Sequence, residues 1–152
     1  MKFELLSSQH DRSSFDCGNV EINQFLITQA NQQAKKGISK THVLVSLEAP
    51  AVIIGFYSLS SLSLSLSLKG FPKIIPAMLI GKLGVDVRFQ KQGFSKVLLA
   101  QALKKIKQYA QEIGIAFVVI DAKDEKLSLF YQQFGFETTT VPLRLILPVS
   151  KI

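Results

Sequence analysis

A polar turn between an apolar run and an amphipathic pattern lies in the middle of this 152-residue chain, where residues 83–99 read LGVDVRFQKQGFSKVLL. The pattern predicts a β-strand that runs directly into a helix, with the helix beginning just after the turn. The first N–H groups of such a helix have no intrahelical partner, and the helix dipole makes that end positive. Gly93 lets the backbone approach a ligand closely, and Lys91 and Lys96 add positive charge. We therefore predict an anion site here, with a pyrophosphate as its ligand.

The segments around this turn predict a βαβ unit over residues 77–120. Residues 77–87 are apolar almost throughout, as expected of a central strand that is covered on both faces. The helix that follows the turn ends before Gly114 and has one apolar face. The residues of this face are Val97, Leu98, Ala102, Leu103, Ile106, Ala110 and Ile113. Residues 115–120 are again apolar, so the two strands are expected to be parallel neighbours.

The remaining periodic segments predict the rest of a mixed sheet and two more helices. They are a short strand at 1–6, a helix at 20–36, strands at 41–47 and 51–59, a helix at 124–134, and a hairpin of strands at 136–140 and 144–147. We therefore expect an α/β fold in which helices flank a mixed sheet. A chain of this length fits a single domain of residues 1–152.

Serine and leucine alternate strictly over residues 61–68. In an extended chain, this period of two places the four leucines on one face and the serines on the other. The pattern favours a half-buried strand, and a flexible low-complexity insert is the alternative. Leu59 is out of phase with the four leucines, so a β-bulge or bend is expected at the Ser60–Ser61 pair. The open edge of such a strand is a candidate pairing surface.

The clustering of lysines at residues 35–40 and 104–107 favours an anionic partner over the alternative of a soluble basic protein. Lysine and arginine outnumber aspartate and glutamate by 18 to 11, which gives a net charge of +7. Charge alone leaves open whether this partner is a nucleotide cofactor, an RNA, or both. Cys17 is the only cysteine and there are two histidines, so neither a disulfide nor a metal site is expected. Without a signal-like segment or an apolar run of about 20 residues, the expected location is the cytoplasm, with no membrane partner.

Two motifs resemble the GNAT superfamily of acetyltransferases. Residues 90–95, QKQGFS, resemble the family's acetyl-CoA turn, Gln/Arg-x-x-Gly-x-Gly/Ala, with Ser95 in place of glycine or alanine. Residues 127–136, LSLFYQQFGF, resemble the family's later segment x-x-x-Phe-Tyr-x-x-x-Gly-Phe. The two motifs occur in the expected order, on the predicted strand–turn–helix and on the next predicted helix.

Shorter segments are similar to one branch of the superfamily, the toxins of bacterial toxin–antitoxin modules that acetylate aminoacyl-tRNA. These segments are FDCGN at 15–19, NQFL at 23–26, GISKT at 37–41, GFYSL at 55–59, IGKLGVD at 80–86 and PLRL at 142–145. The resemblance covers about residues 15–148. It departs from the family in the Ser-Leu segment and at residues 40–42, where Lys-Thr-His stands in place of Arg-Thr-Tyr.

The resemblance implies a cosubstrate, acetyl-CoA, and a set of residues that act on it. Its candidate contacts are Leu83, Val85, Gln90, Lys91, Gln92, Gly93, Phe94, Ser95 and Lys96. The motif also implies that Tyr131 is the general acid that protonates the leaving CoA thiolate, and a core aromatic is the alternative role for its ring. No carboxylate stands out as a general base. Asp86 is interpreted either as an ordinary acid at the end of a strand or as a group that orients a water.

The same resemblance implies the acceptor and the partners. The acceptor is the α-amine of an aminoacyl-tRNA, whose phosphates are expected to contact Lys35, Lys36, Lys40, Lys82 and Arg88. A ribbon-helix-helix antitoxin is the expected protein partner, and a homodimer through the edge around residues 61–68 is a further hypothesis. Two alternatives stay open: an acetyltransferase for a protein N-terminus, lysine or small amine, and a non-catalytic module that keeps the fold and a nucleotide pocket.

Overall fold

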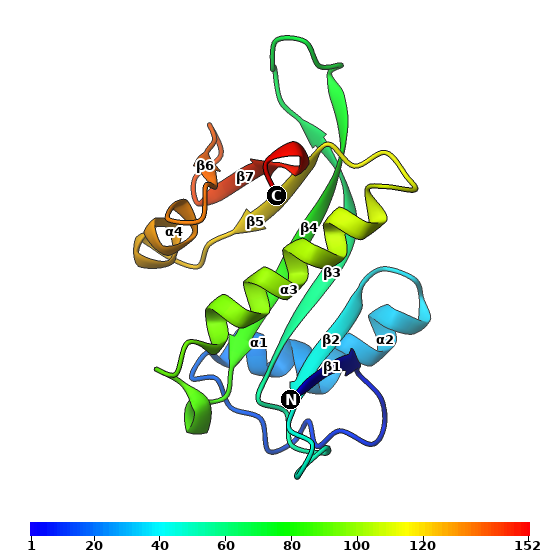
Figure 1. The fold of residues 1–152 in the computed structure, drawn as a ribbon, viewed down its shortest axis with the longest axis vertical. Coiled ribbons are helices and arrows are strands. Elements are labelled where there is room, and N and C mark those ends of the chain that lie inside the picture. The colour runs from blue at the N-terminus through cyan, green and yellow to red at the C-terminus, as the bar shows by residue number, and fades with distance from the viewer. The chain divides into compact units, whose positions relative to one another are not determined.

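The computed structural model describes residues 1–152, which form two compact units. One unit comprises residues 1–60 and 82–102, and the other comprises residues 61–81 and 103–152. The seven strands form one sheet in the order β1-β2-β3-β4-β5-β7-β6, drawn as arrows in Figure 1. A mixed sheet with flanking helices confirms the predicted fold class. The assignment of the whole chain to a single domain stays a prediction.

The first unit is built on antiparallel strands with a helical segment packed on them. β1 (Lys2–Leu5) pairs with β2 (Lys40–Val45), and β2 pairs with the first part of β3 (Gly55–Ser65). The predicted helix at 20–36 consists of α1 (Val20–Gln24), a π-helical turn (Phe25–Gln29) and α2 (Ala30–Lys35). Its apolar residues pack with β2 and β3 in a core that contains Phe15, Ile22, Phe25, Leu26, Ala30, Val43, Val45, Ile53 and Phe56.

Glycine at position 55 permits three elements of the first unit to approach one another closely. These are β3, the end of β4 (Ile74–Val85) and the first half of α3 (Phe94–Tyr109). A Cβ atom on Gly55 would lie 2.8 Å from Leu98 Cδ1 and 2.9 Å from the carbonyl oxygen of Gly84. Both distances are shorter than any real Cβ contact, so only glycine fits here without a shift of the backbone of β4. The segment that leads into the predicted anion site is therefore placed by close backbone packing.

The second unit contains the parallel strand pair that the sequence predicts. β4 pairs in parallel with β5 (Phe117–Asp121), with Ala77 opposite Phe117 at one end and Ile80 opposite Ile120 at the other. This pairing confirms the βαβ unit. β5 also pairs antiparallel with β7 (Arg144–Pro148), and β6 (Glu137–Thr138) completes the predicted hairpin with β7. Helix α4 (Glu125–Gln132) begins after Asp124, whose carboxylate accepts a hydrogen bond from the N–H of Leu127. Single 3₁₀ turns follow β4 (Val87–Phe89) and β7 (Val149–Lys151).

Several predicted boundaries and two core positions are wrong. β3 begins at Gly55 instead of 51 and continues to Ser65, and β4 begins at Ile74 instead of 77. The bulge or bend expected at the Ser60–Ser61 pair stays a prediction. Helix α3 ends at Tyr109, which leaves Ile113 in the following turn and 60% exposed. Val97 is 42% exposed because the buried face of α3 passes through Leu98, Leu99, Ala102 and Ile106 instead. No helix combines the length and the apolarity that crossing a membrane requires.

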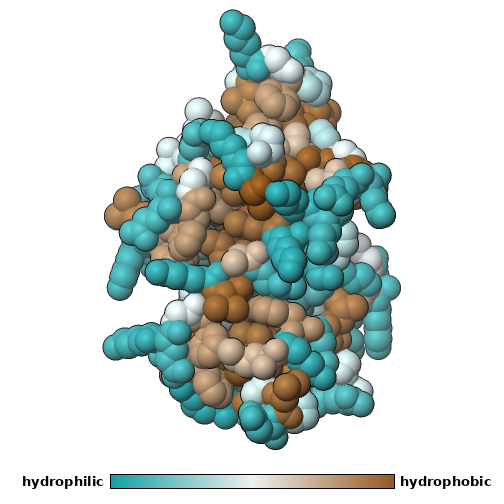
Figure 2. Space-filling model, viewed as in Figure 1, coloured by the Kyte–Doolittle hydropathy of each residue, from teal (hydrophilic) through white to brown (hydrophobic).

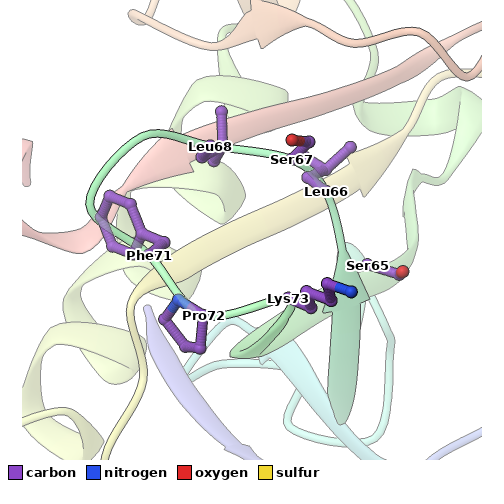
Figure 3. Close-up of a pocket in the computed structure, with 7 residues that line it drawn as sticks. All are labelled: Ser65, Leu66, Ser67, Leu68, Phe71, Pro72 and Lys73. Atoms are coloured by element: carbon purple, nitrogen blue, oxygen red, sulfur yellow. The ribbon is translucent and has the colours of Figure 1, made fainter.

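The Ser-Leu segment is a half-buried strand as far as Ser65. Leu64 is 2% exposed and packs with Ile75 and Phe117, while the neighbouring serines face solvent. Beyond Ser65 the chain forms a loop around a cavity of about 280 Å³ (Figure 3), lined by Ser65, Leu66, Ser67, Leu68, Phe71, Pro72 and Lys73. Figure 2 shows apolar surface at this tip of the β3–β4 hairpin, where Phe71 and Ile74 are exposed. The alternation therefore produces a strand, as predicted, and an apolar loop at its end.

Candidate active site

The turn between β4 and α3 has the geometry of an anion site. Lys91 and Gly93 have left-handed backbone conformations, with φ of +64° and +85°. The first intrahelical bond at this end runs from the N–H of Val97 to the carbonyl of Gly93, at 3.3 Å. The N–H groups of Phe94, Ser95 and Lys96 therefore have no partner within the helix. The first turn of α3 contains no acidic residue, so nothing there opposes the binding of an anion.

The space next to this turn is open. A Cβ atom on Gly93 would have no other atom within 4 Å. The side chains of Lys91, Gln92 and Lys96 are exposed, and Ser95 is only half-buried. No other atom therefore lies close to Gly93 on the side where a Cβ would project.

Leu83 and Val85 present their backbone groups away from β3. Two neighbouring N–H groups bond toward β3: Lys82 to Ser58 Oγ and Asp86 to the Ile54 carbonyl, both at 2.9 Å. Because backbone groups alternate along a strand, those of Leu83 and Val85 point to the opposite edge. The pairing of β4 with β5 ends at Ile80, before these residues. This placement suits the predicted main-chain contacts with an extended acyl-pantetheine arm.

Asp86 is fully occupied by hydrogen bonds. Its carboxylate is 1% exposed and accepts bonds from the backbone N–H, Nε and Nη2 of Arg88, at 2.9, 2.8 and 3.1 Å, and from the N–H of Asp16 at 3.1 Å. Burial by itself raises the pKa of Asp86, but the hydrogen bonds from Arg88 and Asp16 outweigh it and leave the pKa below its ordinary value. The carboxylate therefore fixes the entry of the turn, which favours the structural interpretation over water orientation.

Replacing Asp86 should destabilise the protein in a pH-dependent way. Asp86→Ala leaves a guanidinium and two N–H groups without their acceptor, and we expect a loss of about 3 kcal/mol in the free energy of unfolding at pH 7. Because folding lowers the pKa of Asp86, its contribution is complete above the ordinary value of 3.8 and is lost as the pH falls through the folded-state value. Urea unfolding of wild type and Asp86→Ala at a series of pH values measures how this difference in the free energy of unfolding depends on pH.

Asp121→Ala is the matched control for this prediction. Asp121 also pairs with an arginine, Arg144, at 2.8 Å, but its side chain is 47% exposed, so its loss should cost under about 1 kcal/mol. An equal loss of unfolding free energy in both variants would contradict the role given to Asp86. So would a difference in unfolding free energy between wild type and Asp86→Ala that does not shrink in acid.

The five predicted tRNA contacts have different local roles. Lys35 and Lys36 are exposed at the end of α2. The ammonium of Lys40 donates to the Ala34 carbonyl at 3.0 Å, so it also caps this helix. Arg88 binds Asp86 through one edge of its guanidinium and keeps half of its side chain exposed, and Lys82 is half-buried on β4. The structure thus groups three of these lysines around the end of α2.

Tyr131 lies on α4, in the second unit. Its ring contacts those of Phe130 and Phe136, with centroids 5.4 and 6.1 Å away, and the residue is 6% exposed. Burial, with a smaller effect of the Asp124 charge, raises the pKa of Tyr131 to about 12. The phenol is therefore protonated at neutral pH, as a proton donor must be. The packing also fits the core-aromatic alternative, since the ring belongs to the core while the hydroxyl has no hydrogen-bonding partner.

Sequence reasoning missed a link between the turn and the N-terminal region. The side-chain amide of Gln90, a residue predicted to contact the cofactor, donates to the carbonyls of Cys17 and Val85. The FDCGN segment was a signal for this link, because it belongs to the same family resemblance as the turn. Burial raises the pKa of the Cys17 thiol, which agrees with a structural cysteine. His42 is buried and stacks on Tyr57, so it is a packed residue.

The sheet, the strand–turn–helix and comparisons with known proteins define the class of this protein. Residues 14–144 match the acetyltransferase (GNAT) domain, so the chain belongs to this family. Among curated relatives, the probable toxin TacT of Sinorhizobium fredii (strain NBRC 101917 / NGR234) is 32% identical over 161 residues, covering 95% of this chain and 88% of the relative. A tRNA-acetylating toxin of Mycobacterium tuberculosis (strain ATCC 25618 / H37Rv) is 28% identical over 149 residues, covering 93% and 88%.

Solved structures with similar folds are also toxins of this kind. AtaT complexed with acetyl-methionyl-tRNAfMet superimposes with a TM-score of 0.89 at 27% identity, covering 98% of this chain and 95% of that one. AtaTR bound with AcCoA superimposes with a TM-score of 0.88 at 26% identity, covering 98% of this chain and 94% of that one. A tyrosine-to-phenylalanine mutant of AtaT bound to the C-terminus of the antitoxin AtaR superimposes with a TM-score of 0.86 at 25% identity. It covers 98% of this chain and 93% of that one. These matches confirm the resemblance to GNAT toxins.

Proposed function

We propose that this protein transfers the acetyl group of acetyl-CoA to the α-amine of an aminoacyl-tRNA, and that it acts as a toxin because the blocked amine stops translation. The observation that carries the proposal is the left-handed turn at Lys91 and Gly93, with three free N–H groups at the start of α3. The curated relatives and the similarity to AtaT in complex with acetyl-methionyl-tRNAfMet support this acceptor.

The turn holds the pyrophosphate of acetyl-CoA in this proposal. The N–H groups of Phe94, Ser95 and Lys96 donate to its oxygens, and Lys91 and Lys96 offset its charge. Gln92 and Gly93 shape the loop that the pyrophosphate approaches. The pantetheine arm pairs with the backbone of Leu83 and with the N–H of Val85, whose carbonyl already accepts a hydrogen bond from Gln90. The similarity to AtaTR bound with AcCoA supports acetyl-CoA as the cosubstrate.

The chemistry is a direct transfer between the two substrates. The unprotonated amine attacks the thioester carbonyl, the new C–N bond forms, and the C–S bond breaks to release the CoA thiolate. Tyr131 supplies a proton to this thiolate as its charge develops, and the proton that the attacking nitrogen loses returns to the tyrosinate, so that the products are the amide and the CoA thiol. The α-amine of an aminoacyl ester has a lower pKa than a lysine amine, so a strong general base is unnecessary.

Basic residues of the first unit bind the tRNA phosphates in this proposal. Lys35, Lys36 and Lys40 cluster at the end of α2, and Lys82 and Arg88 lie on β4 and just after it. Such contacts release counterions, so the affinity for tRNA should fall steeply as salt rises. The net charge of +7 agrees with a polyanionic acceptor.

We also propose an antitoxin partner for this chain, and the cytoplasm as the place where it meets charged tRNA. The structure of an AtaT mutant bound to the C-terminus of AtaR supports a protein partner of this type. A ribbon-helix-helix fold for that partner, and a homodimer of this chain, remain predictions.

The acceptor can be identified directly with labelled acetyl-CoA. Purified protein is incubated with bulk aminoacyl-tRNA, deacylated tRNA, a polyamine or a peptide, and acid-precipitable label is measured. We expect label only on aminoacyl-tRNA, recovered as N-acetyl-aminoacyl ester after nuclease digestion. Label on the polyamine or the peptide alone would favour the alternative acceptors, and CoA binding without any transfer would favour a non-catalytic module.

A further inference from the structure

The N-terminal residues 15–19, which we call the Cys17 loop, are tied to the segment that leads into the turn. The side-chain amide of Gln90 donates to the Cys17 carbonyl at 2.9 Å and to the Val85 carbonyl at 2.8 Å. These two carbonyls lie 73 and 5 residues earlier in the chain. A primary amide has two N–H donors, so both donors of Gln90 are used within the protein. Gln90 therefore has no amide donor left for a phosphate.

Two more bonds join the same segments. The N–H of Val87 donates to the Asp16 carbonyl at 2.7 Å, and the N–H of Asp16 donates to the buried carboxylate of Asp86 at 3.1 Å. The Cys17 loop and residues 85–90 are thus joined by hydrogen bonds from both side-chain and main-chain groups. The strand end, the 3₁₀ turn and the first residue of the anion-binding turn are all fixed against one loop.

The Cys17 loop is itself held by helix α1. Asn23 accepts a hydrogen bond from the N–H of Cys17 at 2.9 Å and donates one to the Asp16 carboxylate at 2.9 Å. The same carboxylate accepts from the N–H of Gly18 at 2.8 Å, and Gly18 has a left-handed φ of +87°. The loop is therefore a rigid anchor for Gln90.

We propose that Gln90 is a positioning residue for acetyl-CoA, which acts through the Cys17 loop and does not touch the cofactor with its side chain. This inference rests on the proposed function of the turn. Gln90 lies immediately before Lys91, where the backbone becomes left-handed, so fixing Gln90 fixes the direction in which the following N–H groups point. Preorganised donors bind an anion more tightly because less conformational freedom is lost on binding. The effect falls on affinity for acetyl-CoA and not on the chemical step.

The variant Gln90→Met tests this role, since methionine keeps the length of the side chain and removes both donors. Gln90 is exposed, so the variant should fold. We expect the KM for acetyl-CoA and the Kd for CoA by calorimetry to rise about five- to tenfold, with kcat within twofold of wild type. Amide exchange at residues 15–19 should also become faster. The control Gln108→Met, at an exposed position on α3, should change none of these.

A double-mutant cycle with Asn23→Ala tests whether the effect passes through the loop. Asn23→Ala releases the Cys17 loop from α1, so it should raise the KM as Gln90→Met does, and the double variant should be no worse than either alone. Fully additive effects, or a Gln90→Met variant with unchanged KM, would overturn the positioning role. If wild-type protein binds no CoA, the proposed function fails and the positioning role fails with it. If wild type binds and Gln90→Met binds equally well, only the positioning role fails.

Discussion

Tyr131→Phe should lower the kcat of acetyl transfer about 10²- to 10⁴-fold, the range that a positioned general acid usually contributes. The KM for acetyl-CoA should change less than threefold, because the phenol acts on the sulfur only as the C–S bond breaks. Expression of wild-type protein in bacteria should arrest growth, and expression of the variant should not. Initial rates with aminoacyl-tRNA and labelled acetyl-CoA give both kinetic constants.

The environment of the phenol explains why the variant should remain folded. The ring packs between Phe130 and Phe136, and phenylalanine keeps that packing. The hydroxyl has no hydrogen bond within the protein to lose. With its pKa raised to about 12, Tyr131 is protonated throughout the neutral range. It is a weaker acid than the CoA thiol, whose pKa is about 8.5, so its donation to the thiolate is completed only when the tyrosinate takes up the proton that the amine loses.

Tyr109→Phe is the matched control for this experiment. Tyr109 is the last residue of α3 and is 37% exposed, so the loss of its hydroxyl should leave the rate unchanged. A Tyr131→Phe enzyme with wild-type kcat would show that Tyr131 is only a core aromatic.

Gly93→Val should weaken the binding of acetyl-CoA about a hundredfold or more. The φ of +85° disfavours any side chain, and a valine would project into the open space from which a pyrophosphate approaches the N–H groups. The loss of one or two hydrogen bonds to a charged group is enough for an effect of this size. Calorimetric titration with CoA measures the loss directly.

Gly70→Val separates strain from ligand contact. Gly70 has the same φ of +85° and also has open space around its Cβ position, but it lies at the tip of the β3–β4 hairpin. Both variants should lose about 1–2 kcal/mol of stability from backbone strain. Only Gly93→Val should lose CoA affinity, and equal losses for the two variants would contradict a pyrophosphate site at the turn.

Much of the fold could be predicted because side-chain periodicity reports directly on strands and helices. The apolar run before the turn gave β4, and the alternation of serine and leucine gave the outer half of β3. Boundaries were less accurate. Residues 51–54 have the pattern of a strand, but Val52 makes only an isolated β-bridge with Asp11 and the regular strand begins at Gly55. Ile113 likewise continues a helical spacing after the helix has ended. Local periodicity does not report which residue is the last to bond within an element.

The candidate site was predicted only where a motif carried it. The anion site at the turn follows from a strand that runs into a helix, and the role of Tyr131 is what the family resemblance implies. The bonds of Gln90 to Cys17 and of Asp86 to Asp16 join residues about 70 positions apart, and no local pattern contains that information. Likewise, the sequence marks Lys40 and Arg88 as positive charges, but only the structure shows that one caps α2 and the other binds a buried carboxylate.

The anchoring of the turn by the Cys17 loop also has a consequence for folding. Contacts between residues so distant in sequence form late, because the entropy of closing the intervening chain must be overcome first. If the turn binds acetyl-CoA as proposed, a chain in which only β4 and α3 have formed would lack the ordered N–H groups, and binding would require the assembled first unit. Since a ligand that binds only the folded state stabilises it by mass action, the cellular pool of acetyl-CoA would select for the completed protein over its folding intermediates.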